Sequence, residues 1–433
     1  MQATASSPKP SVPLISSIKD INNKSSIYFI ITLTSIFSLL FILSLSSISQ
    51  PPTQPNTRYQ SRPDPHLFPP RPPFTNRIPS DPTPPSIAYL ISGSKSDSAR
   101  ILRLLYASYH PRNHYLLHLD LYATQAERDR LALTVQSLPL FRAAQNVNVI
   151  GKADFAYPKG SSPISATLHG ASILLRLTKK WDWFINLRAC DYPLVTQDDL
   201  LHIISYLPKD LNFVNHSSYV GWKESRQMKP IIVDPGLYLS ETTEMFYATQ
   251  KRELPNAFRL FTGSTFSILS HDFIDFCILG TDNFPRILLM YLSNTPSSLS
   301  NYFPTILCNS RQFNRTVVNH NLLYVTFNKT SKEKSHSLTS KDFDAMIQSG
   351  AAFATEFQFD DPILDRIDQE ILRRSPGKVV PGGWCLDGSK NGTCSNWQSW
   401  GDADILSPGP GARRLETRIV ELLNSTFRSR QCI

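Results

Sequence analysis

The chain has 433 residues, of which 41% are hydrophobic and 18% are charged. This composition suits a protein that buries a large core, and it excludes a globally disordered chain. The net charge of +9 is scattered along the sequence instead of forming a basic cluster. We therefore expect no nucleic-acid partner. The length fits either two average domains or one large catalytic domain with N-terminal additions.

The N-terminal region contains a candidate membrane span. No charged side chain occurs between residues 25 and 57, and residues 27–48 form a 22-residue run rich in Ile, Leu and Phe. Such a run is long enough to cross a hydrocarbon layer of about 30 Å as a helix. It predicts one transmembrane signal anchor, with a cleaved signal peptide as the alternative interpretation.

The flanking charges predict the orientation of this span. Lys9, Lys19 and Lys24 precede it, whereas the next cation, Arg58, lies ten residues beyond it. The positive-inside rule then makes residues 1–26 a cytosolic tail and places the rest in the lumen of the secretory pathway.

A spacer is expected after the span. Residues 49–85 are rich in proline, with 13 of the 33 prolines of the chain between residues 51 and 85. This composition favours an extended stem over a packed domain. We expect the remaining residues, 86–433, to form one luminal domain.

Two further features suit an oxidising, glycosylating compartment. All six cysteines follow the span, and Cys385 and Cys394 enclose a short loop rich in Gly and Asn, so we expect them to form a disulfide. Zinc is the rival interpretation, but this cysteine spacing matches no ligand pair and no histidine is near. Five Asn-x-Ser/Thr sequons are candidate glycosylation sites: Asn215, Asn314, Asn328, Asn391 and Asn424.

The luminal domain opens with a strand-helix-strand pattern. Residues 87–93 form an apolar run, residues 96–110 have apolar positions at helical spacing, and a second apolar run ends at Asp120. This is the beginning of a parallel sheet, in which ligands dock at the carboxyl ends of strands. Ser92, Gly93 and Asp120 are therefore candidates for binding a nucleotide. The alternative is that Gly93 shapes a turn and Asp120 caps a strand.

The pattern then repeats. A core-packed helix is expected over residues 163–180 and an apolar strand over 181–187. Asp191 ends that strand and is a site candidate, whereas Asp198 or Asp199 is expected to cap the next helix. The chain has no GxGxxG after its first strand and no GxxxxGK[ST], which argues against dinucleotide and P-loop sites.

Several segments, taken in order from residue 87 to 432, resemble the plant branch of the core-2/I-branching glycosyltransferase family, glycosyltransferase family 14. They include IAYLISGSKSDSARILRLLYASYH, YPKGSSPISATLHGASILL, FINLRACDYPLVTQDDL, CNSRQFNRTVVNHNLLYV and GDADILSPGPGARRLE. The resemblance implies an α/β fold with a GT-A-like, Rossmann-type nucleotide-sugar domain behind a single transmembrane helix. It also implies a type II Golgi membrane protein that transfers sugar from a UDP-sugar to a glycan acceptor with inversion. For the plant branch it implies β-glucuronosyltransferase activity on the galactan of arabinogalactan glycoproteins.

Two Asp-x-Asp sequences could hold a metal against a diphosphate. The first, Asp342-Phe-Asp344, stands at an apparent helix start, where carboxylates favour the positive end of the helix dipole. The second, Asp402-Ala-Asp404, opens the GDADILSPGPGARRLE segment. Because the family that the chain resembles works without metal, we expect no metal and no cofactor.

Inverting transfer requires a base for the acceptor hydroxyl and positive charge for the departing diphosphate. Cations at Arg413 and Arg414, which open a helix over residues 412–423, oppose its dipole and suggest either an external anion or a solvated helix start. The candidate diphosphate partners are Lys152, Lys159, His336, Arg413 and Arg414.

The chain departs from the family at both chemical groups. The resemblance implies a glutamate base in a Ser-Pro-Glu-Gly-Tyr-Phe context, where this chain has Ser300. It implies a diphosphate-binding lysine where this chain has Glu356, and a second cation near His336. The resemblance also implies a Gly-Ser-Ala-Trp pattern at residues 263–266, where this chain has Gly-Ser-Thr-Phe.

These departures leave two hypotheses. The first is an active Golgi transferase with a rearranged site, whose base comes from another carboxylate. The second is a catalytically weak or inactive member that binds carbohydrate or acts as a scaffold. The carboxylates that could replace the base are Glu241, Glu244 and Asp234.

Overall fold

A computed structural model of the protein describes residues 83–217, 226, 228–238, 244–327, 336–386, 400–424 and 432. The predicted tail, span and most of the stem lie outside these residues. So do four of the predicted site, sequon and disulfide residues: Glu241, Asn328, Asn391 and Cys394. Within the described part of the chain, no helix is long and apolar enough to cross a bilayer.

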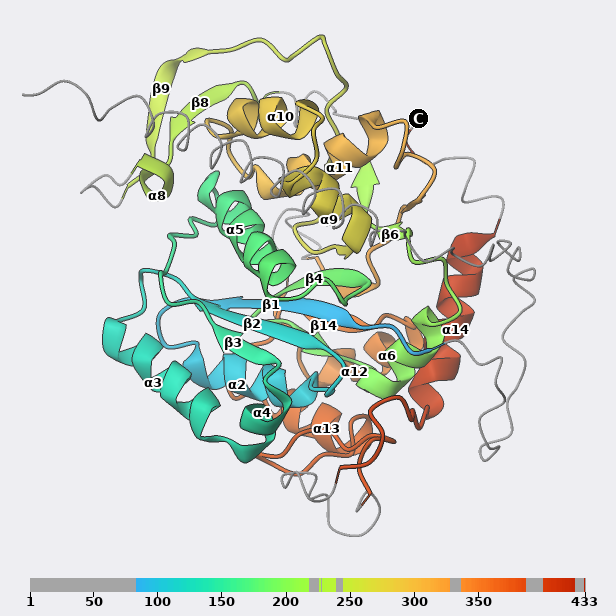
Figure 1. Ribbon diagram of the computed structural model, residues 1–433. Coiled ribbons are helices and arrows are strands. Elements are labelled where there is room, and N and C mark those ends of the chain that lie inside the picture. The colour runs from blue at the N-terminus through green and yellow to red at the C-terminus, as the bar shows by residue number, and fades with distance from the viewer. Residues whose placement is uncertain are drawn as a thin grey trace, which may run out of the picture. The chain divides into compact units, whose positions relative to one another are not determined.

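A seven-stranded sheet forms the centre of the domain (Figure 1). Strands β1 to β4 run parallel to one another, whereas β11 is antiparallel to both of its neighbours. The strands lie in the order β12 (Val317–Val318), β6 (Asn212–Phe213), β11 (Ile268–Ser270), β4 (Trp183–Arg188), β1 (Ile87–Gly93), β2 (His114–Leu119) and β3 (Val147–Val149).

Strand β1 is covered on both faces. Residues 87–91 of this strand are all buried. A central parallel strand is covered on both faces, so its sequence is a continuous apolar run. Successive side chains point to opposite faces, so Tyr89 and Ile91 enter one hydrophobic core while Ala88 and Leu90 enter the other. The domain therefore has two cores separated by the sheet.

Helices cover each face of the sheet (Figure 1). One core receives α5 (Ser162–Leu177), α9 (His271–Ile278), α10 (Phe284–Leu292) and α11 (Leu299–Asn309). The other receives α2 (Ser98–Ala107), α3 (Gln125–Ser137), α4 (Pro139–Ala144), α6 (Gln197–Ile204), α12 (Phe343–Gln348), α13 (Pro362–Glu370) and α14 (Pro410–Leu423). This layered arrangement around a central sheet confirms the α/β part of the predicted fold class.

Smaller sheets and short helical turns lie outside the seven-stranded sheet. A three-stranded sheet joins β13 (Leu323–Val325), β14 (Phe353–Thr355) and β5 (Tyr192–Pro193). The remaining elements are the pairs β8 (Pro230–Val233) with β9 (Phe246–Lys251) and β7 (His216–Ser217) with β10 (Thr262–Gly263), the short helix α8 (Pro235–Tyr238) and a 3₁₀ turn, Ser340–Asp342.

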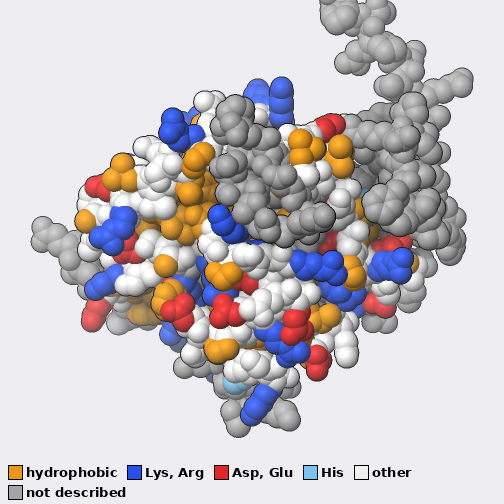
Figure 2. All heavy atoms as spheres, turned by 90° about the horizontal axis from the view of Figure 1, so that it is seen from below, with side chains coloured by type: hydrophobic (Ala, Val, Ile, Leu, Met, Phe, Trp, Pro, Cys, Tyr) orange, Lys and Arg blue, Asp and Glu red, His pale blue; other side chains and the backbone are white. Residues whose placement is uncertain are grey.

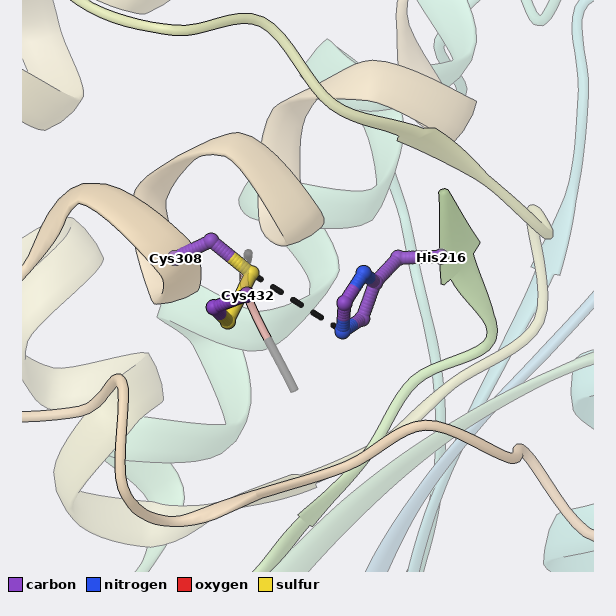
Figure 3. Close-up of side chains that lie close together, drawn as sticks. All are labelled: His216, Cys308 and Cys432. Carbon is purple, nitrogen blue, oxygen red and sulfur yellow. Dashed lines mark hydrogen bonds between the residues drawn. A yellow bond between two sulfur atoms is a disulfide. The ribbon is translucent and has the colours of Figure 1, made fainter. Parts of the chain in front are cut away.

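A disulfide joins Cys308 at the end of α11 to Cys432, 124 residues further on. Figure 3 shows His216 facing this bridge, with its Nε2 atom 3.8 Å from the Cys308 sulfur. Because the two sulfurs are bonded to each other, neither is a thiolate that could bind a metal ion. Cys385 is also disulfide-bonded, and its expected partner Cys394 lies outside the described residues.

Charge is mixed on the face that Figure 2 shows. Lysine and arginine side chains alternate there with aspartate and glutamate, without a patch of one sign. A nucleic-acid surface would gather cations along one groove or stripe. Among the described residues that this view shows, the charges are mixed instead.

Candidate active site

The path of the chain through the sheet marks a topological switch point between the neighbouring strands β1 and β4. From β1 the chain adds β2 and then β3 on one side, and it returns to add β4 on the other side. In open α/β sheets, ligands bind at such a switch point, beyond the carboxyl ends of the strands. Ser92 and Arg188 are register partners at these ends, and the Ala189 amide donates to the Ser92 carbonyl at 2.8 Å.

The turn after β1 has no space for a side chain at Gly93. A Cβ atom there would lie 2.8 Å from the Asp97 Cβ and 2.9 Å from the Ile101 Cδ1. The Asp97 carboxylate accepts from the Ser94 amide at 2.9 Å, which closes the turn into α2. Gly93 thus allows the backbone of this edge to pass directly against the start of α2.

Asp120 follows β2 and lies against the same turn. Its amide donates to the Gly93 carbonyl at 3.0 Å, and its carboxylate accepts from the Ser94 hydroxyl and the Tyr122 amide, both at 3.0 Å. Burial raises the pKa of Asp120. The structure therefore brings Ser92, Gly93 and Asp120 together at one edge, where Asp120 also shapes the turn.

Three aromatic rings that the sequence analysis did not name stand beside Asp120. Tyr122 meets Phe155 edge to face at a centroid distance of 5.2 Å, and it lies 5.9 Å from Tyr157. Rings beside a nucleotide site can stack on a base. For Tyr122 the available signal was its position, two residues after the predicted strand that ends at Asp120.

Asp154 anchors the loop that carries two of these rings. Its carboxylate contacts the ring of His169 on α5, and its carbonyl accepts from the Leu121 amide at 3.3 Å. The loop is thus held to α5 on one side and to the end of β2 on the other.

Asp234, a candidate base, is fully buried and holds the start of α5. One of its carboxylate oxygens accepts from the Ser161 and Ser162 amides at 2.7 Å each, and the other accepts from the Gly236 amide at 2.8 Å. A carboxylate in this position stabilises the positive end of a helix dipole. These contacts assign Asp234 to the fold rather than to proton transfer. Glu244 is exposed, just before β9.

Ser300 lies in the first turn of α11, near the loop that joins β3 to α5. The Ser297 amide donates to the Lys159 carbonyl at 3.0 Å, and the Ser300 hydroxyl donates to the Ser297 carbonyl at 2.8 Å. Lys159 itself is exposed. The position of the expected base is therefore occupied by a hydroxyl that hydrogen-bonds its own helix turn.

Asp191 and its neighbours form a charged cluster at the end of β4. The buried Asp191 carboxylate accepts from the Arg188 amide at 2.8 Å and from the Thr355 hydroxyl at 2.6 Å. The Arg188 guanidinium lies 3.0 Å from that hydroxyl and 3.4 Å from Asp191. Asp191, and more weakly Glu356, raise the pKa of Arg188. The sequence analysis named Asp191 and Glu356 but not Arg188.

Glu356 reaches the cluster through strand pairing. Strand β14 pairs with β5, and the Phe357 amide donates to the Cys190 carbonyl at 3.0 Å. The Glu356 carbonyl accepts from the Leu338 amide at 2.9 Å, and exposed His336 lies two residues before Leu338. Lys152 is exposed in the loop after β3.

Arg413 and Arg414 lie away from this edge, so the structure does not bring them together with the other predicted donor-binding residues. Their helix α14 packs on α6, and the Arg414 guanidinium donates to the Leu194 carbonyl at 3.4 Å. The first residue of α6, Gln197, accepts from Asn113, which immediately precedes β2. Because parallel strands begin at one edge and end at the other, α6 and α14 meet the amino edge of the sheet.

Both Asp-x-Asp sequences have structural partners. Asp404 forms an ion pair with Arg112, which also precedes β2 and lies at the amino edge. Asp342 accepts from the Thr339 amide at 2.9 Å in a capping box, which confirms the capping interpretation of the first sequence.

The predicted caps of α6 behave differently from each other. Asp199 completes a capping box with Thr196. Asp198 instead accepts from the distant Gly383 and Ser407 amides, both at 2.7 Å, and burial raises its pKa to about 6.

The fold is a layered α/β arrangement around a largely parallel sheet, and this edge is its switch point, where such folds bind nucleotides. Comparison with known proteins makes the class specific. The family model "Branch: Core-2/I-Branching enzyme" matches residues 87–347. The chain belongs to the core-2/I-branching enzyme family and is therefore a glycosyltransferase, which uses a nucleotide-sugar donor and a glycan acceptor.

Individual relatives support the membership. The chain is 49% identical to "Beta-glucuronosyltransferase GlcAT14A" of Arabidopsis thaliana, over 82% of this chain and 80% of that protein. It is 50% identical to "Beta-glucuronosyltransferase GlcAT14B" of the same plant, over 80% of each chain. Xylosyltransferase 1 of Rattus norvegicus is 28% identical over 57% of this chain and 29% of its own length. The resemblance to the plant branch is thus confirmed.

Proposed function

We propose that this protein transfers glucuronic acid from UDP-glucuronic acid to a β-galactan of arabinogalactan glycoproteins, with inversion at the sugar carbon. The observation that carries the proposal is the 49% identity, over 82% of the chain, to a β-glucuronosyltransferase. The GT-A-like assignment rests on the order of β3, β2, β1 and β4 and on the turn at Gly93. In this proposal the nucleotide lies along the carboxyl edge, between Asp120 and the end of β4.

A donor screen tests this function. The full-length protein is incubated with UDP-glucuronic acid, UDP-xylose or UDP-N-acetylglucosamine and a β-galactan acceptor, and UDP release is compared with and without the acceptor. We expect acceptor-dependent release from UDP-glucuronic acid above that from the other two donors. Preference for either of the other sugars would contradict the proposed donor.

The proposed location is the Golgi membrane, with a single span and a luminal catalytic domain. The uncharged run over 27–48 and the preceding lysines support it. Glycans need accessible asparagines, and Asn215 and Asn424 are exposed whereas Asn314 is half-buried. Glycosidase treatment should lower the protein's mass, and protease added to sealed Golgi vesicles should remove only the short N-terminal tail. Digestion of the main domain in sealed vesicles would reverse this orientation.

We also propose that transfer needs no metal ion, because basic side chains meet the diphosphate. Asp342 caps a helix, and Asp404 pairs with Arg112 at the opposite edge of the sheet, so neither Asp-x-Asp sequence is placed for a metal at the switch point. A chelator should leave the rate of sugar transfer nearly unchanged. Loss of transfer on chelation and its rescue by manganese would show that a metal is required.

A second candidate function is carbohydrate binding or scaffolding with weak or absent catalysis. It is favoured by Ser300, whose hydroxyl cannot serve as the acceptor base, and by Glu356, which places a carboxylate close to Arg188. A full-length protein that binds β-galactan but releases no UDP from any donor would favour this function.

A further inference from the structure

Two arginines near the carboxyl edge of the sheet, Arg100 and Arg128, are held by contacts within the protein. The guanidinium of Arg100 pairs with Asp97 and donates to the Phe357 carbonyl at 2.7 Å. That of Arg128 donates to two backbone carbonyls, including that of Asp120 at 3.2 Å. Both side chains therefore hold the fold of the edge.

Arg188 differs from these two. Its side-chain contacts with Thr355 and Asp191 both use Nη2, and the other guanidinium nitrogens have no partner among the residues that the structure describes. Its side chain is 50% exposed, whereas that of Asp191 is 1% exposed. Two contacts therefore hold the guanidinium on its buried side. Its other N–H groups remain available to a ligand.

The backbone places Arg188 at the switch point. It is the last residue of β4 and the register partner of Ser92, next to the Gly93 turn. A diphosphate bound across the carboxyl ends of β1 and β4 would meet this position. Arginine suits such a ligand because its planar fork donates two parallel hydrogen bonds to phosphate oxygens.

We infer that Arg188 is the cation that binds the diphosphate of the nucleotide-sugar donor, with Asp191 and Thr355 as positioning residues that orient its guanidinium. This inference rests on the proposed function, since it assumes a UDP-sugar donor. During transfer the glycosidic bond between the sugar carbon and the diphosphate oxygen breaks, and that electron pair stays on the departing UDP. A guanidinium at that oxygen stabilises the developing negative charge.

The carboxylates near Arg188 set the strength of this contact. Asp191 and Glu356 both act electrostatically on the guanidinium. They keep it charged, but they also reduce the positive potential that a diphosphate meets at this edge. Arg188 therefore supplies the positive charge for the donor beside these two carboxylates.

Binding of UDP and of uridine to the full-length protein, measured by calorimetric titration, separates the diphosphate contact from the rest of the site. Arg188→Gln should weaken UDP binding about tenfold or more while changing uridine binding less than about twofold, because uridine has no diphosphate. Arg188→Lys should recover part of the loss, since it restores the charge without the planar fork. Retained uridine binding shows in the same experiment that the variant is folded.

Arg142→Gln is the matched control, because Arg142 is exposed on α4, which precedes β3 and lies at the amino edge. It should bind UDP as the wild type does. If the wild type transfers sugar and Arg188→Gln binds UDP normally, the inference is wrong and the proposed function stands. If the wild type binds neither UDP nor uridine and transfers no sugar, both are wrong.

Discussion

The double change Ser300→Glu and Glu356→Lys should raise the rate of transfer to a β-galactan acceptor by about tenfold or more, because each change restores a group that the chemistry requires. A carboxylate at residue 300 would supply a base for the acceptor hydroxyl, a contribution of about 10² to 10⁴ in rate where the geometry is right. Ser300 is favourably placed, since its turn contacts the loop that leads into α5.

The change at residue 356 acts on the leaving group. A carboxylate near the diphosphate repels the charge that develops on UDP, and a lysine would attract it, with each term about 1 to 3 kcal/mol in a partly buried site. Glu356 lies close enough to Arg188 to raise the pKa of that guanidinium. In the Glu356→Lys variant, the introduced ammonium group and the Arg188 guanidinium would present two cations to one diphosphate.

Initial rates with UDP-glucuronic acid, measured for the wild type, both single variants and the double variant, test this prediction. The control is Ser300→Gln, which has the size of the glutamate but cannot act as a base. Robust wild-type transfer that either restoring change lowers would show that the site uses different residues for both tasks.

Loss of the Cys308–Cys432 disulfide should lower the free energy of unfolding by about 2 to 5 kcal/mol. The bridge closes a loop across a sequence separation of 124 residues, so it restricts the unfolded chain strongly. It also attaches the C-terminal end of the chain to α11, the helix that carries Ser300 in its first turn. Removing it should therefore lower the stability of the helix that carries Ser300.

Urea unfolding of the full-length protein measures this effect. Cys308→Ser, Cys432→Ser and the double variant should all lose the same amount, because each removes the same bridge. Cys190→Ser is the control, since Cys190 is free. Unfolding of Cys432→Ser at the wild-type urea concentration would contradict a stabilising role for the bridge.

The sequence predicted the elements whose pattern is local. The strand over 87–93 agrees with β1 residue for residue, and the expected helix over 163–180 is α5 shifted by a few residues. The last helix was expected over residues 412–423, and in it Leu415, Ile419 and Leu422 are buried at helical spacing. Continuous apolar runs and helical spacing carry this information without any contact between distant residues.

The missed features depend on long-range contacts. Asp234 occupies the start of α5 across a separation of 72 residues, so no local pattern distinguishes it from a free base. Arg413 and Arg414 lie at the opposite edge of the sheet, because α14 packs on α6. Helix α6 begins beside Asn113 rather than at the end of β4. The guanidinium of Arg188 donates to the hydroxyl of Thr355, which lies on β14, 167 residues further along the chain. No local pattern around Arg188 indicates this contact.

The central claim is that this chain transfers glucuronic acid from a UDP-sugar to a β-galactan with inversion. The most direct test is nuclear magnetic resonance of the oligosaccharide product formed by the full-length wild-type protein from UDP-glucuronic acid and a β-galactan acceptor. The account predicts a new glucuronic acid residue in β-linkage on the galactan, because inversion converts the α-linked sugar of the donor into a β-linked product. An α-linked product, or an unmodified acceptor after prolonged incubation with this donor, would contradict it.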